Sequence, residues 1–520
     1  MARRRSSKAR IQPAAVSLKH LVGTADRYDV IVVGAGPAGS TLAWKLACEG
    51  VNTIVLDGAS FPREKVCGDY VEPRGLRLLD KMGCLPTLEA TSPLPIMYTS
   101  IYVDFKKCFI GKIPFYGVNQ DLPAHGYVVP RKVLDEVMLK TAIAAGATAH
   151  QETYVTDFRN TRNGVAIEAL HHGKRVVYQG RMVVGADGVN SVVARRAGVL
   201  VDDPRHIAIS QRAYADGYEG GIGEATMFFD GDLFPGYGWV FPMGRGQVNL
   251  GVGVLKEACE RDHIVIPQLF RNFFEKLKQF HPRCGKLQLC RPPIGGIVKT
   301  YGGAGPNYFE NGLLVGDAGS FVDPMTGEGI TLAMESALIA AGSVLDVLQK
   351  RQIHAKSFST YEAEYRKYFD PSMICVDFCA ATMRNRHYWR SWRKALVRGC
   401  ELAQGDSKFA VTVGACFGGL EINPPGILAE LWMRTAENLL SIGSQSVLEL
   451  LEGGANGTRF TLQETAGWIT DSWESLWDDP FWHARWATDV QRKWVRTLAV
   501  VNKRLPDPRT KGVIEWARRG

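Results

Sequence analysis

The sequence of 520 residues contains no Cys-x-x-Cys pair, and its cysteines are odd in number, at eleven. Cys375 and Cys379 are spaced by one helical turn, but neither has a histidine partner nearby. Disulfide frameworks and structural zinc sites depend on regular spacings of cysteine, or of cysteine and histidine. We therefore expect reduced thiols, a cytoplasmic location and no metal site.

Long apolar runs are also missing. No stretch of eighteen or more uninterrupted apolar residues occurs, whereas a membrane-spanning helix needs about twenty predominantly apolar residues. We predict no transmembrane helix. Membrane contact, if it occurs, is expected to be peripheral, at the protein surface.

Acidic residues are absent from the first 25 positions. Six Lys and Arg residues precede the first acid, Asp26, so of the net charge of +9 only +3 belongs to the rest of the chain. We predict that residues 1–26 form a basic, disordered leader, with a transit peptide or a tether to an anionic surface as the alternatives. The leader lacks the apolar centre of a secretory signal. Nothing else supports a nucleic-acid partner, and no pattern indicates an oligomeric state.

The first clear element is a strand–helix–strand unit near the amino end. Residues 28–34 (YDVIVVG) form an apolar, β-branched run that predicts a strand buried on both faces. An apolar helical stretch follows over residues 40–49, and residues 52–57 (NTIVLD) predict a second strand. Together they indicate a βαβ unit.

A dinucleotide-binding fingerprint lies inside this unit. It comprises Gly34, Gly36, Pro37, Ala38, Gly39 and, at the end of the second strand, Asp57. The first glycine permits a tight turn, the second lets the backbone approach a diphosphate, and the third lets the helix pack on the strand. The carboxylate of Asp57 is placed to accept hydrogen bonds from an adenosine ribose. The fingerprint alone does not distinguish FAD from NAD.

The remaining chain alternates between two patterns. Strand, helix and strand are expected over residues 127–155, a hairpin to about residue 178, and buried strands at 182–188 and 312–317. Residues 205–300 are mostly strand-like, including 236–243 and 247–255, which predicts a separate antiparallel sheet. A helix is expected over 330–347, and the chain from residue 361 onward is largely helical.

Four blocks carry a more specific signal: residues 61–69 (FPREKVCGD), 185–188 (GADG, with Ser191 and Arg195 beyond it), 236–242 (GYGWVFP), and 316–319 (GDAG) continued by 324–330 (PMTGEGI). With these blocks the sequence resembles the geranylgeranyl reductase family, within the superfamily that also holds flavin monooxygenases and flavin-dependent halogenases. The similarity runs from about residue 28 to about residue 342.

The resemblance implies an α/β fold. It predicts a Rossmann-type FAD-binding domain of the glutathione reductase and p-hydroxybenzoate hydroxylase type, an antiparallel β substrate domain and a helical C-terminal region. We assign residues 27–94, 127–200 and 305–347 to the FAD-binding domain, and 95–126 and 201–304 to the substrate domain. Residues 348–520 form a mainly helical, Trp-rich region.

The resemblance also implies which residues form the site. Those implied to bind FAD are Gly34, Gly36, Pro37, Ala38, Gly39, Asp57, Arg63, Cys67, Gly68, Arg131, Asp187, Gly316, Asp317, Pro324, Gly327, Gly329 and Ile330. Those implied to act in catalysis are Cys67, Trp239, Gly327, Glu328 and Gly329. The segment 324–330 precedes a helix, and a positive helix end beside the flavin stabilises its anionic reduced form.

Each assignment also has a simpler interpretation. Arg63 and Arg131 can be solvated surface residues, and Cys67 can be a small buried hydrophobe. Trp239 fits core packing as well as it fits a pocket wall, and the segment 324–330 can be only a helix cap.

The function implied by the resemblance is the reduction of C=C bonds in a hydrophobic, isoprenoid-type substrate by reduced flavin, with NAD(P)H as the transient electron donor. The main alternative is an NAD(P)H- and O₂-dependent monooxygenase, a hydroxylase or epoxidase. Halogenation is disfavoured because the Trp-x-Trp-x-Ile-Pro segment of halogenases is replaced by residues 238–242 (GWVFP), and Lys65 is only a candidate for their lysine. A non-catalytic flavoprotein is the least favoured interpretation.

Tryptophan is concentrated near the carboxyl end. Ten of the twelve tryptophans lie in the region 389–520. The spacing of Trp473, Trp477, Trp482 and Trp486 approximates one helix face, interrupted at Pro480. Core packing explains such a face, and the alternatives are an amphipathic lid over an apolar tunnel or a surface that contacts lipid.

Overall fold

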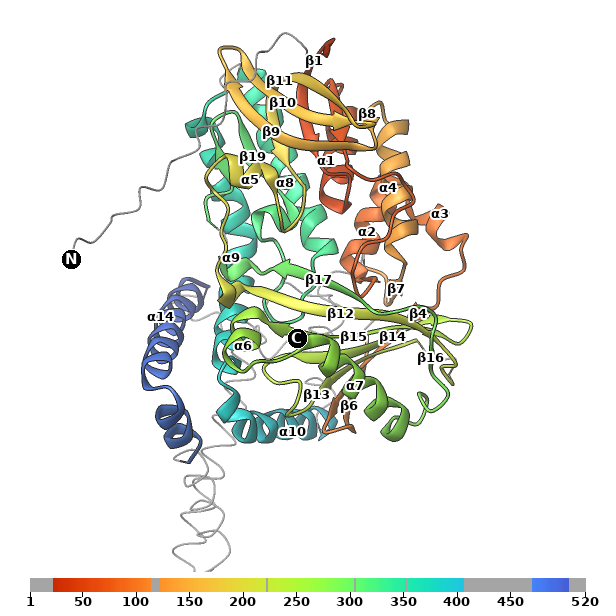
Figure 1. Cartoon of the computed structure of the whole chain (residues 1–520), viewed down its shortest axis with the longest axis vertical. Coiled ribbons are helices and arrows are strands. Elements are labelled where there is room, and N and C mark those ends of the chain that lie inside the picture. The colour runs from red at the N-terminus through yellow and green to blue at the C-terminus, as the bar shows by residue number, and fades with distance from the viewer. Residues whose placement is uncertain are drawn as a thin grey trace, which may run out of the picture.

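The computed structural model describes residues 22–113, 122–220, 223–303, 305–350, 353–405 and 470–504. Most of the predicted leader (1–21) and a long part of the Trp-rich region (406–469) lie outside the described residues. Two large sheets follow one another along the long axis of the molecule, as Figure 1 shows, with helices around both.

The first sheet contains the predicted βαβ unit. Its strand order is β18-β19-β11-β1-β2-β8, and β1 pairs in parallel with both β2 and β11. The strands β9 and β10 extend β11 as an antiparallel excursion. The bounds are β1 Val22–Val33, β2 Thr53–Leu56, β8 Thr148–His150, β9 Thr153–Thr161, β10 Gly164–His171, β11 Lys174–Gly185, β18 Tyr308–Phe309 and β19 Gly312–Leu314.

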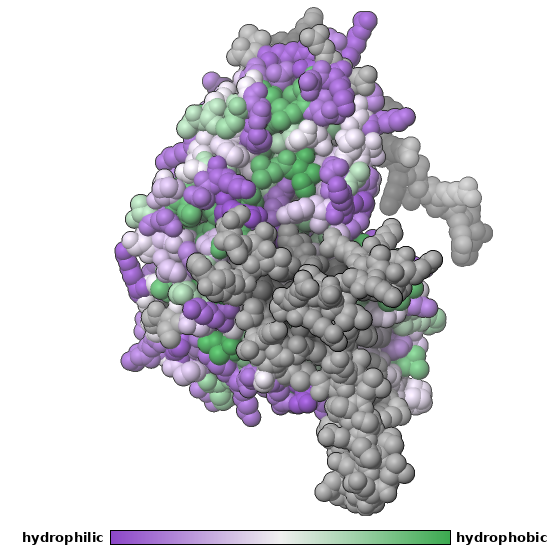
Figure 2. Space-filling model, turned by 180° about the vertical axis from the view of Figure 1, so that it is seen from behind, coloured by the Kyte–Doolittle hydropathy of each residue, from purple (hydrophilic) through white to green (hydrophobic). Residues whose placement is uncertain are grey.

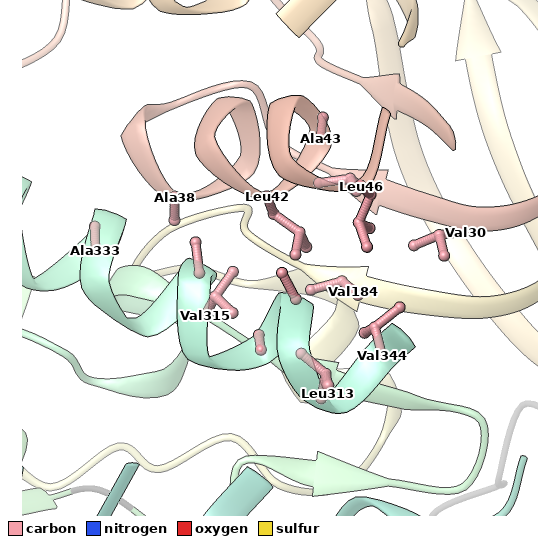
Figure 3. Packing of buried hydrophobic residues seen from close by; sticks show 14 of the residues in the cluster. Val30, Ala38, Leu42, Ala43, Leu46, Val184, Leu313, Val315, Ala333 and Val344 are labelled. Carbon is pink, nitrogen blue, oxygen red and sulfur yellow. The ribbon is translucent and has the colours of Figure 1, made fainter. Parts of the chain in front are cut away.

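Helices pack on this sheet through small and branched apolar side chains. The helices are α1 (Pro37–Cys48), α4 (Arg131–Ala144), α5 (Val192–Arg196) and α8 (Ile330–Lys350). Figure 3 shows Leu42 and Leu46 of α1 and Val344 of α8 directed toward Val30 and Val184 of the sheet. All five are fully buried. Val30 and Val32 belong to this cluster, whereas Ile31 and Val33 pack on the other face with residues of β9 and β10. The apolar run of the first strand is therefore buried on both sides, which explains why it lacks the alternation of a half-exposed strand.

The second sheet has the order β16-β12-β15-β14-β13-β5-β6, with β17 also paired to β12. Its bounds are β5 Tyr98–Val103, β6 Lys106–Lys112, β12 Ile207–Asp216, β13 Glu224–Phe229, β14 Tyr237–Gly244, β15 Gln247–Leu255, β16 Gln288–Leu289 and β17 Ile294–Lys299. The segment 98–112 thus joins the sheet formed by residues 207–299. All described pairings are antiparallel except β13 with β5.

The prediction of mainly strands over 205–300 missed two helices, α6 (Lys256–Arg261) and α7 (Ile266–Phe280). The second covers the sheet with Leu269, Phe270, Phe273 and Leu277, all of them buried. These positions recur at helical rather than strand spacing. The signal was present in the sequence, but the neighbouring strand patterns obscured it.

A small sheet connects the two large ones. It has the order β3-β7-β4, with bounds β3 Tyr70–Val71, β4 Pro95–Ile96 and β7 Gly126–Val128. Two helices, α2 (Pro73–Met82) and α3 (Leu85–Glu89), follow β3 and pack against α8 and α4. This arrangement brings the segment 61–75 to the junction between the two large sheets.

The C-terminal helices are α9 (Ser359–Met383), α10 (Trp389–Gly405) and α14 (Pro480–Arg504), and a short helix over residues 470–478 precedes the last of these. The helix α14 packs along α9, as Figure 1 shows. Buried ionic contacts hold it there: Lys493 binds Asp377, and Arg384 binds Asp489.

By length and composition, α8 is the described helix that would be able to cross a membrane, but 72% of its most apolar window is buried inside the protein. It is the central packing helix of the first sheet. Figure 2 shows hydrophilic residues over much of the coloured surface with smaller apolar areas among them, as is usual for folded proteins.

Candidate active site

A cavity of about 760 Å³ lies where the two large sheets meet. It begins at the glycine turn after β1, passes the loop before α8, and ends against strands β13, β14 and β15. Its size is in the range of sites that enclose a cofactor or a drug-sized ligand. The carboxyl ends of the parallel strands open into it, as expected for an open α/β sheet.

The glycine turn has the geometry that its sequence predicts. Gly34 has a φ of +100°, and a Cβ there would lie 2.3 Å from the carbonyl oxygen of Ala186. A Cβ on Gly39 would lie 1.9 Å from the carbonyl oxygen of Gly34, so only glycine lets α1 start this close to the turn. Pro37 is the first residue of α1, and no side chain caps its N-terminus at Gly36. The first amides of α1 are therefore oriented toward the cavity to receive an anion.

Two guanidinium groups face this helix end. A Cβ on Gly36 would lie 3.7 Å from Nη2 of Arg63 and 3.7 Å from Nη2 of Arg131. Both arginines are anchored by Asp135 of α4, whose side chain is completely buried: Arg131 binds it through Nε at 2.7 Å and Nη2 at 2.9 Å, and Arg63 through Nη1 at 3.1 Å. Nη2 of Arg63 also lies 3.9 Å from Oδ2 of Asp57. The carboxylates of Asp135 and Asp57 thus hold the two guanidinium groups beside the start of α1.

Asp57 follows β2 and lies beside the same turn. Its Oδ2 accepts a hydrogen bond from the amide of Ala35 at 2.7 Å, and its Oδ1 accepts one from the amide of Ala59 at 2.9 Å. Each oxygen keeps a second lone pair. The predicted ribose contact is therefore compatible with the geometry, and the carboxylate also binds the turn to the loop after β2.

Asp187 lines the cavity but uses its carboxylate locally. It accepts hydrogen bonds from the hydroxyl of Ser191 at 2.6 Å and from the amides of Val192 and Val193 at 2.7 and 3.2 Å. Burial raises its pKa, while these hydrogen bonds oppose the shift. The carboxylate therefore caps the start of α5 and shapes the loop after β11.

Gly316 and Asp317 follow β19 at the opposite wall. Gly316 has a φ of +59°, and a Cβ there would meet Cβ of Ala38 at 2.9 Å, so the glycine lets α1 approach this loop. Asp317 faces the cavity, and burial raises its pKa, while Lys65 and then Arg131 oppose the shift.

The loop before α8 is tightly folded. Asp323 accepts hydrogen bonds from the amides of Met325 and Thr326, both at 2.8 Å, and the hydroxyl of Tyr237 binds the carbonyl oxygen of Thr326. Gly327 has a φ of +70°. The predicted residues of this loop, Pro324, Gly327, Glu328, Gly329 and Ile330, all line the cavity.

The Cys67 loop crosses the cavity from the other side. Its sulfur accepts a hydrogen bond from the amide of Asp69 at 3.3 Å, and its carbonyl oxygen accepts one from Nδ2 of Asn249 at 2.9 Å. Burial raises the pKa of the thiol, against the effect of Arg131, so the group is a neutral thiol near pH 7. A Cβ on Gly68 would lie 3.1 Å from the ring of Phe241, which shows how closely the loop approaches the second sheet.

Trp239 belongs to the wall that faces this loop. Its indole N–H donates a hydrogen bond to Oδ1 of Asn249 at 3.0 Å, and its ring contacts those of Tyr237 and Phe241. Only 7% of the residue is exposed, and it lines the cavity. Both sequence interpretations therefore apply, because the ring is packed in the sheet and forms a wall of the cavity.

Several polar residues of the site were missed from the sequence. Asp135 is spaced four residues after Arg131, a helical ion-pair spacing that would have indicated it. Asn249 and Tyr214 come from strands β15 and β12 and reach Asp69 from far along the chain. No local pattern marks such residues.

These features fit a dinucleotide that carries a diphosphate. The uncapped start of α1 and the two guanidinium groups suit a diphosphate, Asp57 suits a ribose, and the enclosed volume beyond them suits a ring system. Nη1 of Arg63 is buried and makes no hydrogen bond of good geometry among the described residues. That atom faces Asp135, and the Nη2 atoms of Arg63 and Arg131 are the ones that lie nearest Gly36, where an oxyanion would bind.

Comparisons with known proteins agree with this geometry. The FAD binding domain family matches residues 27–213. A menaquinone reductase of Mycolicibacterium smegmatis is 32% identical over 325 residues, which cover 61% of this chain and 76% of the relative. A digeranylgeranylglycerophospholipid reductase of Methanosphaera stadtmanae is 29% identical over 327 residues, covering 60% of this chain and 76% of the relative.

Solved structures share the fold. A geranylgeranyl bacteriochlorophyll reductase-like protein of Thermoplasma acidophilum superposes with a TM-score of 0.65 at 22% identity, over 78% of this chain and 99% of its own. The predicted fold class is thereby confirmed, as is the predicted resemblance.

Proposed function

The chain belongs to the geranylgeranyl reductase family of FAD-dependent oxidoreductases, and on this premise we propose that it saturates C=C bonds in the polyprenyl part of a lipid. NAD(P)H is the proposed electron donor. The observation that carries the proposal is the continuous cavity that joins the glycine turn to the aromatic wall of the second sheet.

The wall of the cavity supports an apolar substrate. Its lining on the second sheet includes Met227, Phe229, Tyr237, Trp239 and Phe241. Aromatic and thioether side chains present large apolar surfaces and few hydrogen-bonding groups. A polyprenyl chain has the same character, because it offers branched hydrocarbon and isolated double bonds.

The names of the relatives support the same substrate class. One acts on menaquinone and another on a glycerophospholipid with geranylgeranyl groups. Menaquinone carries a polyprenyl chain, so the two substrates differ in their polar heads and share an isoprenoid tail. We take the tail as the part that this chain reduces.

The proposed site residues divide into three groups along the cavity. Arg63, Arg131 and the start of α1 hold the diphosphate, Asp57 holds the ribose, and the loop after β19 with Asp317 faces the chain that joins diphosphate to flavin. The loop over 324–330 and the Cys67 loop enclose the ring. When bound, FAD supplies two-electron chemistry, and the protein supplies orientation, charge and exclusion of water.

We also propose that the two large sheets correspond to functional domains. The first sheet with α1, α4 and α8 would bind the cofactor, and the second sheet with α6 and α7 would bind the substrate. The cavity between them is then the place where both meet.

Anaerobic reduction with NADPH tests the function directly. Purified protein with bound FAD is mixed with NADPH and a polyprenyl substrate that has no quinone ring, for example a glycerophospholipid with geranylgeranyl groups, and the product mass is measured by mass spectrometry. The proposal expects bleaching of the flavin spectrum and a product heavier by two hydrogens. A product that forms only after air is admitted, and that gains one oxygen, contradicts it and identifies a monooxygenase.

A further inference from the structure

Carboxyl groups are concentrated beside the loop that precedes α8. Four acidic residues lie together there: Glu72, Asp323, Glu328 and Glu335. Glu72 and Glu335 are 7% and 6% exposed, and Oε2 of Glu328 is fully buried. The negative charge of Asp323 is stabilised by hydrogen bonds that two backbone amides donate to its Oδ1. Among the hydrogen bonds of the described residues, Glu328 accepts one backbone amide, from Thr331.

The cation that touches this group is Arg74 of α2. It donates to both oxygens of Glu335, at 2.9 and 3.2 Å, and to Glu72 at 3.3 Å. Arg77 also faces Glu335, and the hydroxyl of Tyr368 donates to it at 3.0 Å. Glu335 and Glu72 therefore each have a cationic contact.

Glu328 has none of these contacts. Its Oε1 accepts the amide of Thr331 at 2.6 Å, but its Oε2 has no hydrogen-bond partner among the described residues. The buried hydroxyl of Tyr70 is also unpartnered there, and it is close enough to Glu72 and Glu328 to interact with both. An ionised oxygen in this position would be buried without compensation, which is costly.

The pKa shifts of Glu328 and Glu72 agree with this geometry. Burial, followed by repulsion from Glu72, raises the pKa of Glu328 well above its usual value, while the Thr331 amide and then Arg74 oppose the shift. Burial raises the pKa of Glu72 to about 7, against the attraction of Arg74. Burial and mutual repulsion therefore both disfavour a state in which the two carboxyls are ionised together.

Saturation of a C=C bond needs a proton as well as a hydride. The hydride adds to one carbon, and the electron pair of the π bond takes a proton at the other. The two electrons come from a nicotinamide donor by way of the cofactor. A donor acid must therefore hold a proton in the cavity, and both Glu328 and Glu72 line it.

We propose that Glu328 is the acid that gives this proton, from Oε2, and that Glu72 shares and returns it. The inference rests on the proposed function. After transfer Glu328 is a carboxylate, and it regains a proton through Glu72 from water. The Arg74–Glu335 pair is assigned a positioning role, since it holds Glu72 beside Glu328.

Infrared spectroscopy of the protein without turnover tests where the proton is. A buried protonated carboxyl has a C=O stretch separate from that of carboxylates. The wild-type minus Glu328→Gln spectrum at pH 7 is expected to contain this band, shifted in D₂O. Gln keeps the oxygen that accepts the Thr331 amide. Glu362→Gln, which removes half of an ion pair with Arg366 on α9, is the matched control and is expected to leave the band intact. A spectrum without the band overturns the assignment.

Half-reactions separate this inference from the proposed function. With its flavin already reduced, Glu328→Gln is expected to form saturated product about 100- to 1,000-fold more slowly than reduced wild type. Glu72→Gln is expected to lower the rate less and to move its pH profile. Equal product formation by wild type and Glu328→Gln overturns the inference and leaves the function standing. A wild-type protein that is reduced by NADPH but saturates no polyprenyl substrate contradicts the function, and the donor role fails with it.

Discussion

The hydroxyl of Tyr214, on the second sheet, donates a hydrogen bond to the carboxylate of Asp69, on the loop between β2 and β3. Asp69 has a φ of 61° and is completely buried, and Nδ2 of Asn249 donates to the same oxygen at 2.9 Å. This contact links the Cys67 loop to the second sheet. The position of the loop over the cavity thus depends on residues 145 and 180 positions away in the sequence.

The first prediction concerns the pH dependence of stability. Burial raises the pKa of Asp69 from 3.8 to about 6, although Tyr214, Arg212 and Asn249 oppose the shift. Between pH 4 and 6 the folded protein therefore holds a proton that the unfolded chain has lost, so this group's contribution falls as pH rises. Asp69→Asn is expected to remove a loss of stability of about 2 kcal/mol that the wild type shows between pH 4 and pH 6.

Urea denaturation of wild type and Asp69→Asn at pH 4, 5 and 6 measures the difference. Asparagine tolerates the positive φ and can accept the same hydrogen bonds, so the variant should fold. Parallel pH profiles for the two proteins would contradict the prediction.

The second prediction concerns the anion corner of the cavity. Arg63→Ala is expected to weaken FAD binding roughly 10- to 100-fold, because a charge-assisted contact contributes about 1.5–3 kcal/mol. Asp135 keeps its two-point contact with Arg131, so the fold should persist. The measurement is quenching of flavin fluorescence on titration with protein.

The control for this titration is Arg159→Ala, which removes an exposed ion pair with Glu168 on the β9–β10 hairpin. Its FAD affinity should equal that of the wild type. Equal affinities for all three proteins would show that Arg63 does not contact the cofactor.

The third prediction compares two glycine substitutions in helices. Gly39→Ala places a Cβ 1.9 Å from a backbone oxygen, whereas Gly342→Ala in α8 meets no atom within 4 Å. We expect the first to lower the free energy of unfolding by about 3 kcal/mol and to reduce FAD retention. The second should raise it by about 0.5–1 kcal/mol. Denaturation with guanidinium chloride ranks the three proteins, and the reverse order would refute the packing argument.

The fourth prediction concerns the tryptophans near the carboxyl end. Trp473 and Trp477 are 62% and 78% exposed, and their stacked rings have centroids 5.6 Å apart. Trp482 is only 8% exposed, and the guanidinium group of Arg261 lies over its ring. Trp473 and Trp477 therefore do not share one helix face with Trp482, since the helix over 470–478 ends before α14 begins. Replacing both exposed tryptophans by serine is expected to lower binding to anionic phospholipid vesicles at least about tenfold.

Co-sedimentation with vesicles provides the measurement. Phe280→Ser, which removes another exposed aromatic (53%) on α7, is the control and should bind as the wild type does. Undiminished sedimentation of the double variant would leave the exposed pair without a role at lipid surfaces.

The site could be predicted in part. The loops that line it were recognisable because each is a short, local pattern: a glycine turn, an acid at a strand end, a glycine-bearing loop before a helix. The polar partners of these loops were not recognisable, except that the i,i+4 spacing of Arg131 and Asp135 indicates an ion pair. Glu72 and Glu328 are 256 positions apart in the sequence. Of the two, only Glu328 was predicted as a site residue.

The sequence by itself determined the βαβ unit and its turn, because strand apolarity, helix spacing and glycine conformation are set by neighbouring residues. It determined the buried strand of β1 and the helix α8 for the same reason. It did not separate α7 from its strand-rich surroundings, since short apolar runs suit both periods. Only the tertiary structure decided which charges meet: sheet pairing and helix packing place Asp135 between two arginines, Tyr214 on Asp69, and Glu328 beside Glu72 with no cation of its own. Such pairings depend on contacts between segments that are distant in the sequence, so the local patterns of the chain do not reveal them.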